Sequence, residues 1–432
     1  MKKKTAYVGI AGDILHEGHI NILKTASKYG DITVGLLTDK AIASYKRIPF
    51  LNYKNRELIL KNLKFVNKVI PQNTLDYSDN LIKVRPDFVV HGNDWKIGVQ
   101  KKIRDKVIKV LKQWGGKLIE PNYTKNISST ILRKNIFKSG ITSEQRKSKL
   151  KRLIEAKSIV RIIEAHSALS ALIAENLNFY QKNKFLEFDG IWSSSLTDST
   201  LRAKPDNQSV DYSTRINGLN DILETCLKPI IFDADNGGRL EHLPYLVKSL
   251  ERLGVSAIVI EDKKGLKKNS LFPDQKTSDQ ESPKEFCKKI RKASDSKVSE
   301  DFLIVARIES LILGKSIKDA LNRAEKYSAA GADAILIHSK EKNPKEIFQF
   351  ANFFKKSKFY KPMIAIPSTY SKTYEEELIK NGFSIVIYAN HLLRASYKAM
   401  YATAKKILIN HTAFEVEKNI TPINEIISLI KP

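Results

Sequence analysis

Short apolar runs alternate with stretches of helical periodicity in the first third of the chain. In the segment 16–29, for example, Ile20, Leu23 and Ala26 recur at the spacing of one helix face. This periodicity predicts strands at 6–12, 32–37 and 88–91 and helices at 16–29, 55–65 and 100–113. Strands that alternate with helices are typical of a parallel sheet covered by helices, so we expect a Rossmann-like α/β domain here.

Beyond residue 140 the pattern changes to eight short apolar runs separated by intervals of helix length. The runs cover 158–163, 190–192, 229–232, 257–260, 303–306, 334–337, 363–366 and 385–388. Eight such strands fit a (β/α)8 TIM barrel, whose active site lies at the carboxyl ends of the strands. The runs are followed by polar sequences such as EAHS, DADNGG, RIES and HSK. The pattern therefore predicts an enzymatic barrel.

A polar, basic segment separates the two patterns. In it, Gly140, Thr142 and Ser143 have the order of a turn followed by a helix cap. We therefore divide the chain into a nucleotide-binding domain at 1–138, a linker at 139–150 and a barrel at 151–432. A length of 432 residues agrees with more than one domain.

The charge of the chain is strongly basic and uneven. The net charge is +27, of which residues 1–140 carry +16, which suits a polyanionic ligand such as a nucleotide, a nucleic acid or a membrane surface. Lysines and arginines cluster at 101–112 and 146–152, but no strand interleaves them with aromatic residues. Binding to RNA or DNA thus remains an alternative of a different class, and we expect no nucleic-acid partner.

Cysteine content and hydropathy bear on the compartment. Cys226 and Cys287 are too few for a disulfide scaffold and lack the paired spacing of a zinc site. No apolar run reaches the roughly 18 residues that span a bilayer. We therefore expect a cytoplasmic protein with no membrane partner.

Two histidines give the first third its chemistry. The stretch AGDILHEGH places His16 and His19 three residues apart, with Gly18 between them, where a strand gives way to a helix. A helix N-terminus offers free N–H groups to phosphate, and two imidazoles there can donate hydrogen bonds to a triphosphate. Histidines that merely cap the helix or bind a metal are the alternative.

Residues 5 to about 135 resemble the cytidylyltransferases of the HxGH nucleotidyltransferase superfamily. The resemblance lies in DILHEGH, VGLLTDKAIASYKR, HGNDW and ISST. It implies that His16 and His19 activate the phosphates of CTP, while Lys46 and Arg56 stabilise the departing pyrophosphate. The other nucleotide-binding residues that it implies are Asp13, Asp94, Trp95, Ser128, Ser129 and Thr130. The chain departs from the family pattern at Gly12 and in the segment 123–126, which leaves the acceptor open.

Ionisable residues follow four neighbouring strands of the predicted barrel. Asp233 and Asp235 end one strand and Glu261 ends the next, and such oxygen ligands suit Mg²⁺. Arg307 and His338 follow the next two strands. The loop that directly follows Glu261 carries Lys263, Lys267, Asn269 and Ser270. Cations and hydrogen-bond donors collected in this way fit a small, highly charged phosphate.

Residues 150–430 resemble the phosphoenolpyruvate mutase branch of the isocitrate lyase superfamily, through GIWSSSL, DAD, EDKKGLKKNS, VARIE and ANHLLRAS. The resemblance implies that Asp233 binds Mg²⁺, with Asp235 and Glu261 acting mainly through waters. It assigns catalysis to Asp206 in a gate loop and to Lys267, Asn269, Ser270, Arg307 and His338, and substrate binding to Trp192, Ser194, Ser195, Leu196 and Lys263.

The sequence of the loop EDKKGLKKNS distinguishes members of this superfamily that catalyse different reactions. Lyases that cleave carbon–carbon bonds carry a Cys there, whereas no Cys lies between positions 227 and 286. Phosphonopyruvate hydrolases are more similar, but Asn269 followed by Ser270 favours the mutase. The resemblance thus implies the isomerisation of phosphoenolpyruvate to phosphonopyruvate. It also implies CTP-dependent cytidylyl transfer to a small phosphonate, such as 2-hydroxyethyl- or 2-aminoethylphosphonate, and a homo-oligomer, tetramer or dimer, that uses the helical tail 393–408.

Overall fold

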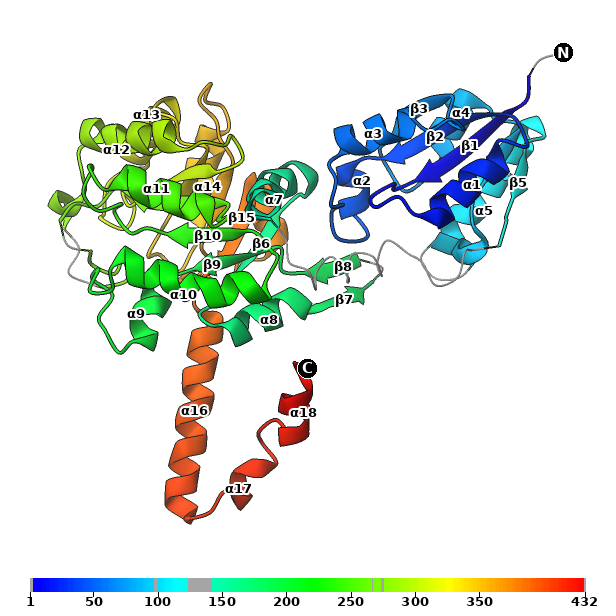
Figure 1. Cartoon of the computed structure of the whole chain (residues 1–432). Helices are drawn as coiled ribbons and strands as arrows, with labels where there is room; N and C mark the ends of the chain where they lie inside the picture. Colours follow the sequence, from blue (N-terminus) through cyan, green and yellow to red (C-terminus); the bar gives the residue numbers. More distant parts are fainter. Residues whose placement is uncertain are drawn as a thin grey trace.

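The computed structural model describes residues 3–96, 100–122, 142–182, 184–265, 267–272 and 276–430. Figure 1 shows an N-terminal α/β domain beside a barrel, from which a long C-terminal helix projects. Both domains have the predicted class, a Rossmann-like sheet followed by a closed parallel barrel. None of the described helices is long and apolar enough to cross a membrane.

The N-terminal domain is a parallel five-stranded sheet with the order β3-β2-β1-β4-β5. The strands are β1 (Thr5–Ile10), β2 (Asp31–Leu37), β3 (Lys68–Gln72), β4 (Phe88–Val90) and β5 (Lys117–Ile119). The helices are α1 (Glu17–Ala26), α2 (Asp39–Ala43), α3 (Tyr53–Lys61), α4 (Ser78–Val84) and α5 (Lys101–Leu111). The order reverses between β1 and β4, and such a switch point creates a crevice at the carboxyl ends of the strands.

Two of the five strands of this sheet were not predicted from the sequence. The edge strands β3 and β5 were not expected, because β3 contains Pro71 and exposes Lys68, and β5 has three residues with an exposed lysine. Neither strand therefore has the apolar run by which a buried strand is recognised. The three central strands, which are mostly buried, were predicted.

All eight predicted barrel strands are present, and they close into one parallel barrel. They are β6 (Val160–Glu164), β9 (Gly190–Ser193), β10 (Ile230–Asp233), β11 (Ala257–Glu261), β12 (Leu303–Ile308), β13 (Ala334–Ile337), β14 (Met363–Ala365) and β15 (Phe383–Tyr388). The helices around them are α8 (Ala168–Asn176), α9 (Ser195–Leu201), α10 (Tyr212–Thr225), α11 (Leu243–Arg252), α12 (Pro283–Ser296), α13 (Ile317–Ala329), α14 (Lys345–Phe354), α15 (Glu375–Lys380) and α16 (His391–Asn410).

The helix α7 (Ser143–Ala156) closes the amino-terminal end of the barrel. Its N-cap Thr142 accepts a hydrogen bond from Gln145 N at 3.4 Å, as the turn-and-cap pattern predicted. Its Leu150 and Leu153 share a buried cluster with Val160, the first residue of β6. Most of the stretch 139–150, which we expected to be a linker, is therefore part of a helix that packs on the barrel.

Two further features interrupt the regular barrel. An antiparallel hairpin, β7 (Asn178–Gln181) with β8 (Lys184–Glu187), is inserted between α8 and β9 and points toward the N-terminal domain in Figure 1. After β15, α16 extends away from the barrel and leads to the short helices α17 (Phe414–Glu417) and α18 (Ile423–Ser428). The sequence did not predict the hairpin, because all four residues of β7 are exposed and show no alternation.

Candidate active sites of the two domains

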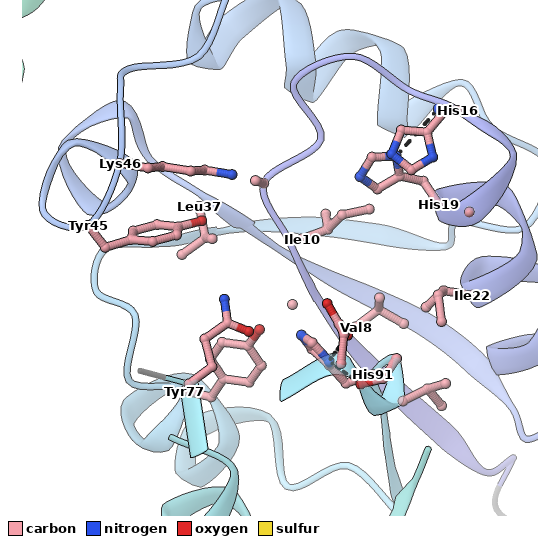
Figure 2. Close-up of a pocket in the computed structure, with 17 residues that line it drawn as sticks. Val8, Ile10, His16, His19, Ile22, Leu37, Tyr45, Lys46, Tyr77 and His91 are labelled. Atoms are coloured by element: carbon pink, nitrogen blue, oxygen red, sulfur yellow. Dashed lines mark hydrogen bonds and ion pairs between the residues drawn. The ribbon is translucent and has the colours of Figure 1, made fainter. Parts of the chain in front are cut away.

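The N-terminal domain holds a cavity of about 330 Å³ at its switch point. The ends of β1 and β4 supply the floor with Gly9, Ile10, Val90 and His91, and the start of α1 supplies one wall. Figure 2 shows His16 and His19 on this wall and Lys46 with Tyr45 on the wall opposite, with the side chains reaching toward the space between. The structure thus brings His16, His19, Lys46 and Asp94 of the predicted nucleotide site around one pocket.

The two histidines are neutral and contact each other. The rings of His16 and His19 lie 4.0 Å apart between centroids, and the backbone N–H of His16 donates to His19 Nδ1 at 3.4 Å. Burial, and then the neighbouring His16 and Lys46, lower the pKa of His19 to about 3. Because Nδ1 accepts, the proton of this neutral ring lies on Nε2, which can donate to a phosphate oxygen. His16 likewise has a lowered pKa through burial.

Arg56 does not have the position that the resemblance implied. The side chain is fully buried, and its Nη1 donates to the backbone oxygens of Ala11 and, at 2.8 Å, Leu37. Its Nη2 pairs with Asp39 at 2.6 Å. The donors of Arg56 are thus used beneath the pocket, where the side chain supports the strand ends, and its predicted stabilisation of pyrophosphate stays a prediction.

Asp13 and Trp95 also act from outside the cavity. Asp13 Oδ1 accepts hydrogen bonds from the backbone N–H groups of Phe50 at 2.6 Å and Leu51 at 3.2 Å, so Asp13 fixes a neighbouring loop. The preceding residue, Gly12, has a φ of +60°, which a glycine adopts without strain. Trp95 is buried, stacks on His91 at 3.9 Å and donates to Glu120. The remaining predicted residues, Ser128, Ser129 and Thr130, lie outside the described ranges.

The barrel holds a second, much smaller cavity at the carboxyl ends of its strands, of about 60 Å³. It brings together most of the site residues predicted for the barrel. The predicted residues that line it are Trp192, Ser194, Ser195, Leu196, Asp206, Asp233, Lys267, Asn269, Ser270, Arg307 and His338. Lys263, Asp235 and Glu261 are buried directly beside these residues.

Lys267 is inserted into the acidic cluster at the end of β10. Its Nζ contacts Asp235 Oδ1 at 2.5 Å, Asp206 Oδ1 at 2.9 Å and the hydroxyl of Ser195. Asp233 accepts from Ser195 Oγ at 2.8 Å. Although burial alone would raise the pKa of Asp233, the charges of Lys267, Arg307 and Arg215 lower it to about 2. Asp233 is therefore an anion at every physiological pH.

The donor set fits a divalent cation. Glu261 is buried and neither of its carboxylate oxygens has a hydrogen-bond partner among the described residues. Burial therefore raises the pKa of Glu261 to about 7. Together with Asp233 and Asp235, Glu261 supplies the hard oxygen atoms that Mg²⁺ prefers. Among the described residues, no three acidic, His or Cys side chains surround one point as they stand, and Lys267 Nζ lies beside Asp235.

Arg307 is the centre of a second charge network. Its Nε pairs with Glu309 at 2.6 Å, and its Nη2 lies 2.9 Å from Ser270 Oγ and 3.1 Å from His338 Nδ1. Glu309 also accepts from Ser270 Oγ at 2.6 Å, and Lys263 Nζ lies 3.3 Å from Glu309. Burial and the charge of Arg307 lower the pKa of His338, which leaves this ring neutral. The network holds both cationic side chains in place before a substrate arrives.

Two buried residues of the barrel site were not identified from the sequence. Glu309 belongs to the RIES motif, and its signal was its place two residues after Arg307 at the end of β12. Arg215 lies on α10, far from any motif, yet it pairs with Asp198 at 2.8 Å and its Nη1 lies 3.6 Å from Asp235. Nothing in the local sequence distinguishes Arg215 from an arginine on a helix surface.

Comparisons with known proteins agree with both sites. Residues 150–408 match the family model of phosphoenolpyruvate phosphomutase, and residues 11–135 match the cytidylyltransferase-like family. A phosphoenolpyruvate phosphomutase from Tetrahymena pyriformis is 35% identical over 68% of this chain and 94% of its own length. The chain belongs to the phosphoenolpyruvate phosphomutase family. It is an enzyme that carries, in addition, a cytidylyltransferase-like domain.

Relatives with other activities are almost as similar. A phosphonopyruvate hydrolase from Variovorax sp. (strain Pal2) is 33% identical over 65% of this chain and 93% of its own length. The solved phosphomutase from Streptomyces platensis subsp. rosaceus superposes with a TM-score of 0.61 at 33% identity, and it covers 67% of this chain and 95% of its own. A phosphonopyruvate hydrolase in complex with oxalate and Mg²⁺ has a TM-score of 0.58 at 32% identity with the same coverage.

Proposed function

We propose that the barrel isomerises phosphoenolpyruvate to phosphonopyruvate with Mg²⁺ as its cofactor. The observation that carries this proposal is the closed contact over the site, in which Asn269 Nδ2 donates to Asp206 Oδ2 at 2.8 Å while Lys267 binds the other oxygen of Asp206. A mutase must keep water away from a transferable phosphoryl group. The Mg²⁺ in the related hydrolase structure supports the choice of cation.

The reaction breaks the bond between the enol oxygen and phosphorus and forms a bond between the methylene carbon and phosphorus. The phosphoryl group passes through a loose, metaphosphate-like state, so catalysis consists mainly of positioning and charge stabilisation. In our assignment Arg307, His338 and Asn269 hold the phosphoryl oxygens, while Ser194 and the backbone of Ser195 and Leu196 hold the substrate carboxylate. A cation bound by Asp233, Asp235 and Glu261 would supply Lewis-acid stabilisation of the enolate.

Hydrolysis of phosphonopyruvate is the second candidate for the barrel, since a hydrolase is 33% identical to this chain. The experiment is to incubate the whole protein with phosphonopyruvate and Mg²⁺ and to follow ³¹P NMR. A mutase converts this substrate downhill to phosphoenolpyruvate. Release of inorganic phosphate with pyruvate, without phosphoenolpyruvate, would instead assign the barrel as a hydrolase.

We further propose that the N-terminal domain transfers a cytidylyl group from CTP to a small phosphonate. A phosphonate oxygen attacks the α-phosphorus of CTP, and pyrophosphate leaves with the electron pair of the broken bond. The neutral ring of His19, with Nε2 as donor, and His16 face Lys46 across the pocket, which fits a triphosphate between them. Asp94 lies at the same pocket, where we place the nucleoside.

We infer the acceptor of the N-terminal domain from the product proposed for the barrel. After decarboxylation and reduction or amination by other enzymes, phosphonopyruvate becomes 2-hydroxyethyl- or 2-aminoethylphosphonate. Pyrophosphate release should therefore be measured with these two compounds, phosphocholine and glycerol 3-phosphate. We expect one of the ethylphosphonates to lead, and a preference of tenfold or more for another acceptor, about 1.4 kcal/mol in transition-state binding, would contradict the proposal.

A homo-oligomer is proposed from the course of α16. The eighth helix of a barrel normally covers the strands beside it, but α16 points away and exposes Tyr397, Met400 and Tyr401 to more than half. An apolar groove of about 400 Å³, lined by side chains such as Ile163 and Tyr388, stays open beside β6 and β15. The α16 of a second copy suits this groove. Light scattering should give a dimer or tetramer, and Tyr401→Lys should shift it toward the monomer.

A further inference from the structure

The segment between α2 and α3 lies between the two domains. Tyr45 and Lys46 of this segment line the nucleotide pocket, while the next residue, Arg47, turns to the barrel. Arg47 Nη1 pairs with Glu175 Oε1 at 2.8 Å, and its Nη2 donates to the backbone oxygen of Glu175 at 2.6 Å. Its Nε pairs with Glu187 Oε2 at 2.6 Å. All three nitrogens of the guanidinium therefore bind the barrel domain, at the end of α8 and at the hairpin strand β8.

Three more contacts from the barrel reach the same segment. The hydroxyl of Tyr180, on the hairpin strand β7, donates to the backbone oxygen of Tyr45 at 3.3 Å. Ile48 is buried in the cluster that contains Leu150 of α7. Arg152 of α7 donates to the backbone oxygens of Pro49 at 2.8 Å and Phe50 at 3.0 Å. The barrel thus holds the segment on both sides of Lys46.

The ion pairs of Arg47 are buried, which makes them specific. The side chains of Glu175 and Glu187 are 11% and 5% exposed. Burial alone would raise the pKa of both carboxyls, but the charges of Lys228 and Arg47 lower it, so both are anions. A buried carboxylate with too little compensating charge is unfavourable, so both carboxylates, which Lys228 also neutralises, favour this position of Arg47. An exposed surface pair would not restrain the chain in this way.

We propose that the barrel positions the phosphate-binding wall of the nucleotide pocket, with Arg47 as the positioning residue that acts through Lys46. The inference rests on the proposed cytidylyl transfer. It goes beyond that proposal because it makes the transferase activity depend on a docked barrel, although none of the described barrel residues lines the nucleotide pocket. Arg152 extends the same support, since it shares Asp39 with Arg56 beneath the pocket at 3.0 Å and 2.6 Å.

The test uses full-length variants and measures three quantities for each. These are CTP binding, followed by calorimetry, the rate of pyrophosphate release and the rate of mutase turnover. We expect Arg47→Ala to lower kcat of cytidylyl transfer roughly tenfold to a hundredfold, as displacement of a phosphate-binding group does. Mutase turnover should stay within twofold of the wild type. Arg47→Lys, which keeps one charge but not the three-way contact, should recover part of the loss. Tyr180→Phe removes only the hydroxyl beside Tyr45 and should lower kcat by a smaller factor.

A double-mutant cycle distinguishes positioning from general loss of structure. If Arg47 acts through Lys46, Arg47→Ala should cause little further loss in a Lys46→Ala background, whereas independent damage would add in full. Lys61→Ala, which removes an ion pair with Glu57 within α3 that does not involve the barrel, is the matched control. Transfer at the wild-type rate in Arg47→Ala, or full additivity with Lys46→Ala, would overturn the inference. Wild-type protein that binds no CTP would instead refute the proposed transferase itself.

Discussion

The two sites lie at the carboxyl ends of parallel strands, yet they are built in opposite ways. The barrel site encloses about 60 Å³, and its charges are already paired with one another, as in the contacts of Lys267 and Arg307. The nucleotide site is a larger cavity of about 330 Å³ whose histidines are neutral. The difference in volume agrees with the chemistry that we propose, because the barrel would hold a small phosphate and exclude water, whereas the N-terminal domain would hold a whole nucleoside triphosphate.

The sites also face away from each other. The N-terminal domain contacts the barrel through α7, Arg47 and Ile48, at the end where the barrel strands begin. The mutase cavity lies at the end where these strands finish. The contact between the domains and the cavity of the barrel therefore lie at opposite ends of the barrel strands. This separation agrees with a sequence of reactions in which other enzymes convert phosphonopyruvate before the transferase acts on it.

The largest effect that separates the two sites is expected from Asp233→Ala. Loss of this anion should remove Mg²⁺ binding and, with it, several kcal/mol of enolate stabilisation, so that mutase turnover falls about a thousandfold or more. Cytidylyl transfer should remain unchanged. Both rates are measured on the same preparation, and Asp295→Ala, an exposed carboxylate on α12, serves as control. A fall in both activities would mean that the sites are not independent in this direction.

The corresponding change in the N-terminal domain is His19→Ala. Removal of the Nε2 donor should lower kcat of pyrophosphate release by about 10² to 10³. The mutase rate should stay at the wild-type value, because the contacts of the N-terminal domain lie at the opposite end of the barrel. The measurement is coupled pyrophosphate release beside ³¹P NMR of the barrel reaction. A drop of less than tenfold would remove His19 from the catalytic machinery.

Closure of the barrel is tested by a smaller change, Asn269→Ala. Without its hydrogen bond to Asp206, the loop 267–272 should close less completely and admit water. We expect mutase turnover to fall about tenfold and part of the substrate to appear as pyruvate and phosphate, which ³¹P NMR measures as a ratio. Lys268→Ala changes the exposed neighbouring residue and should keep the ratio. An unchanged ratio in Asn269→Ala would show that this bond does not exclude water.

The barrel could be predicted from the sequence almost completely, and the nucleotide site only in part. Strands such as β13 are buried over their whole length, so each gives an uninterrupted apolar run. The position of Arg47 could not be predicted, because its partners are the backbone oxygen and carboxylate of Glu175 and the carboxylate of Glu187 in the barrel domain. Such contacts depend on how the two domains pack, and a local motif contains no information about that packing.

The smallest effect concerns protonation, and it tests whether His19 of the nucleotide site is neutral before the substrate binds. An unperturbed histidine titrates near a pKa of about 6.5. Because burial lowers the pKa of His19 to about 3, its ring should remain neutral from pH 8 down to pH 5. In the unfolded chain the same ring takes up its proton near pH 6.5, so acidification should favour the unfolded N-terminal domain. Proton–carbon NMR of the histidine rings, assigned with His19→Ala, should therefore show no titration of His19 in this range in the folded protein and a normal titration in urea. A folded His19 that titrates near pH 6.5 would mean that this histidine becomes charged before CTP binds, and the contrast between paired charges in the barrel and neutral histidine donors in the nucleotide pocket would no longer hold.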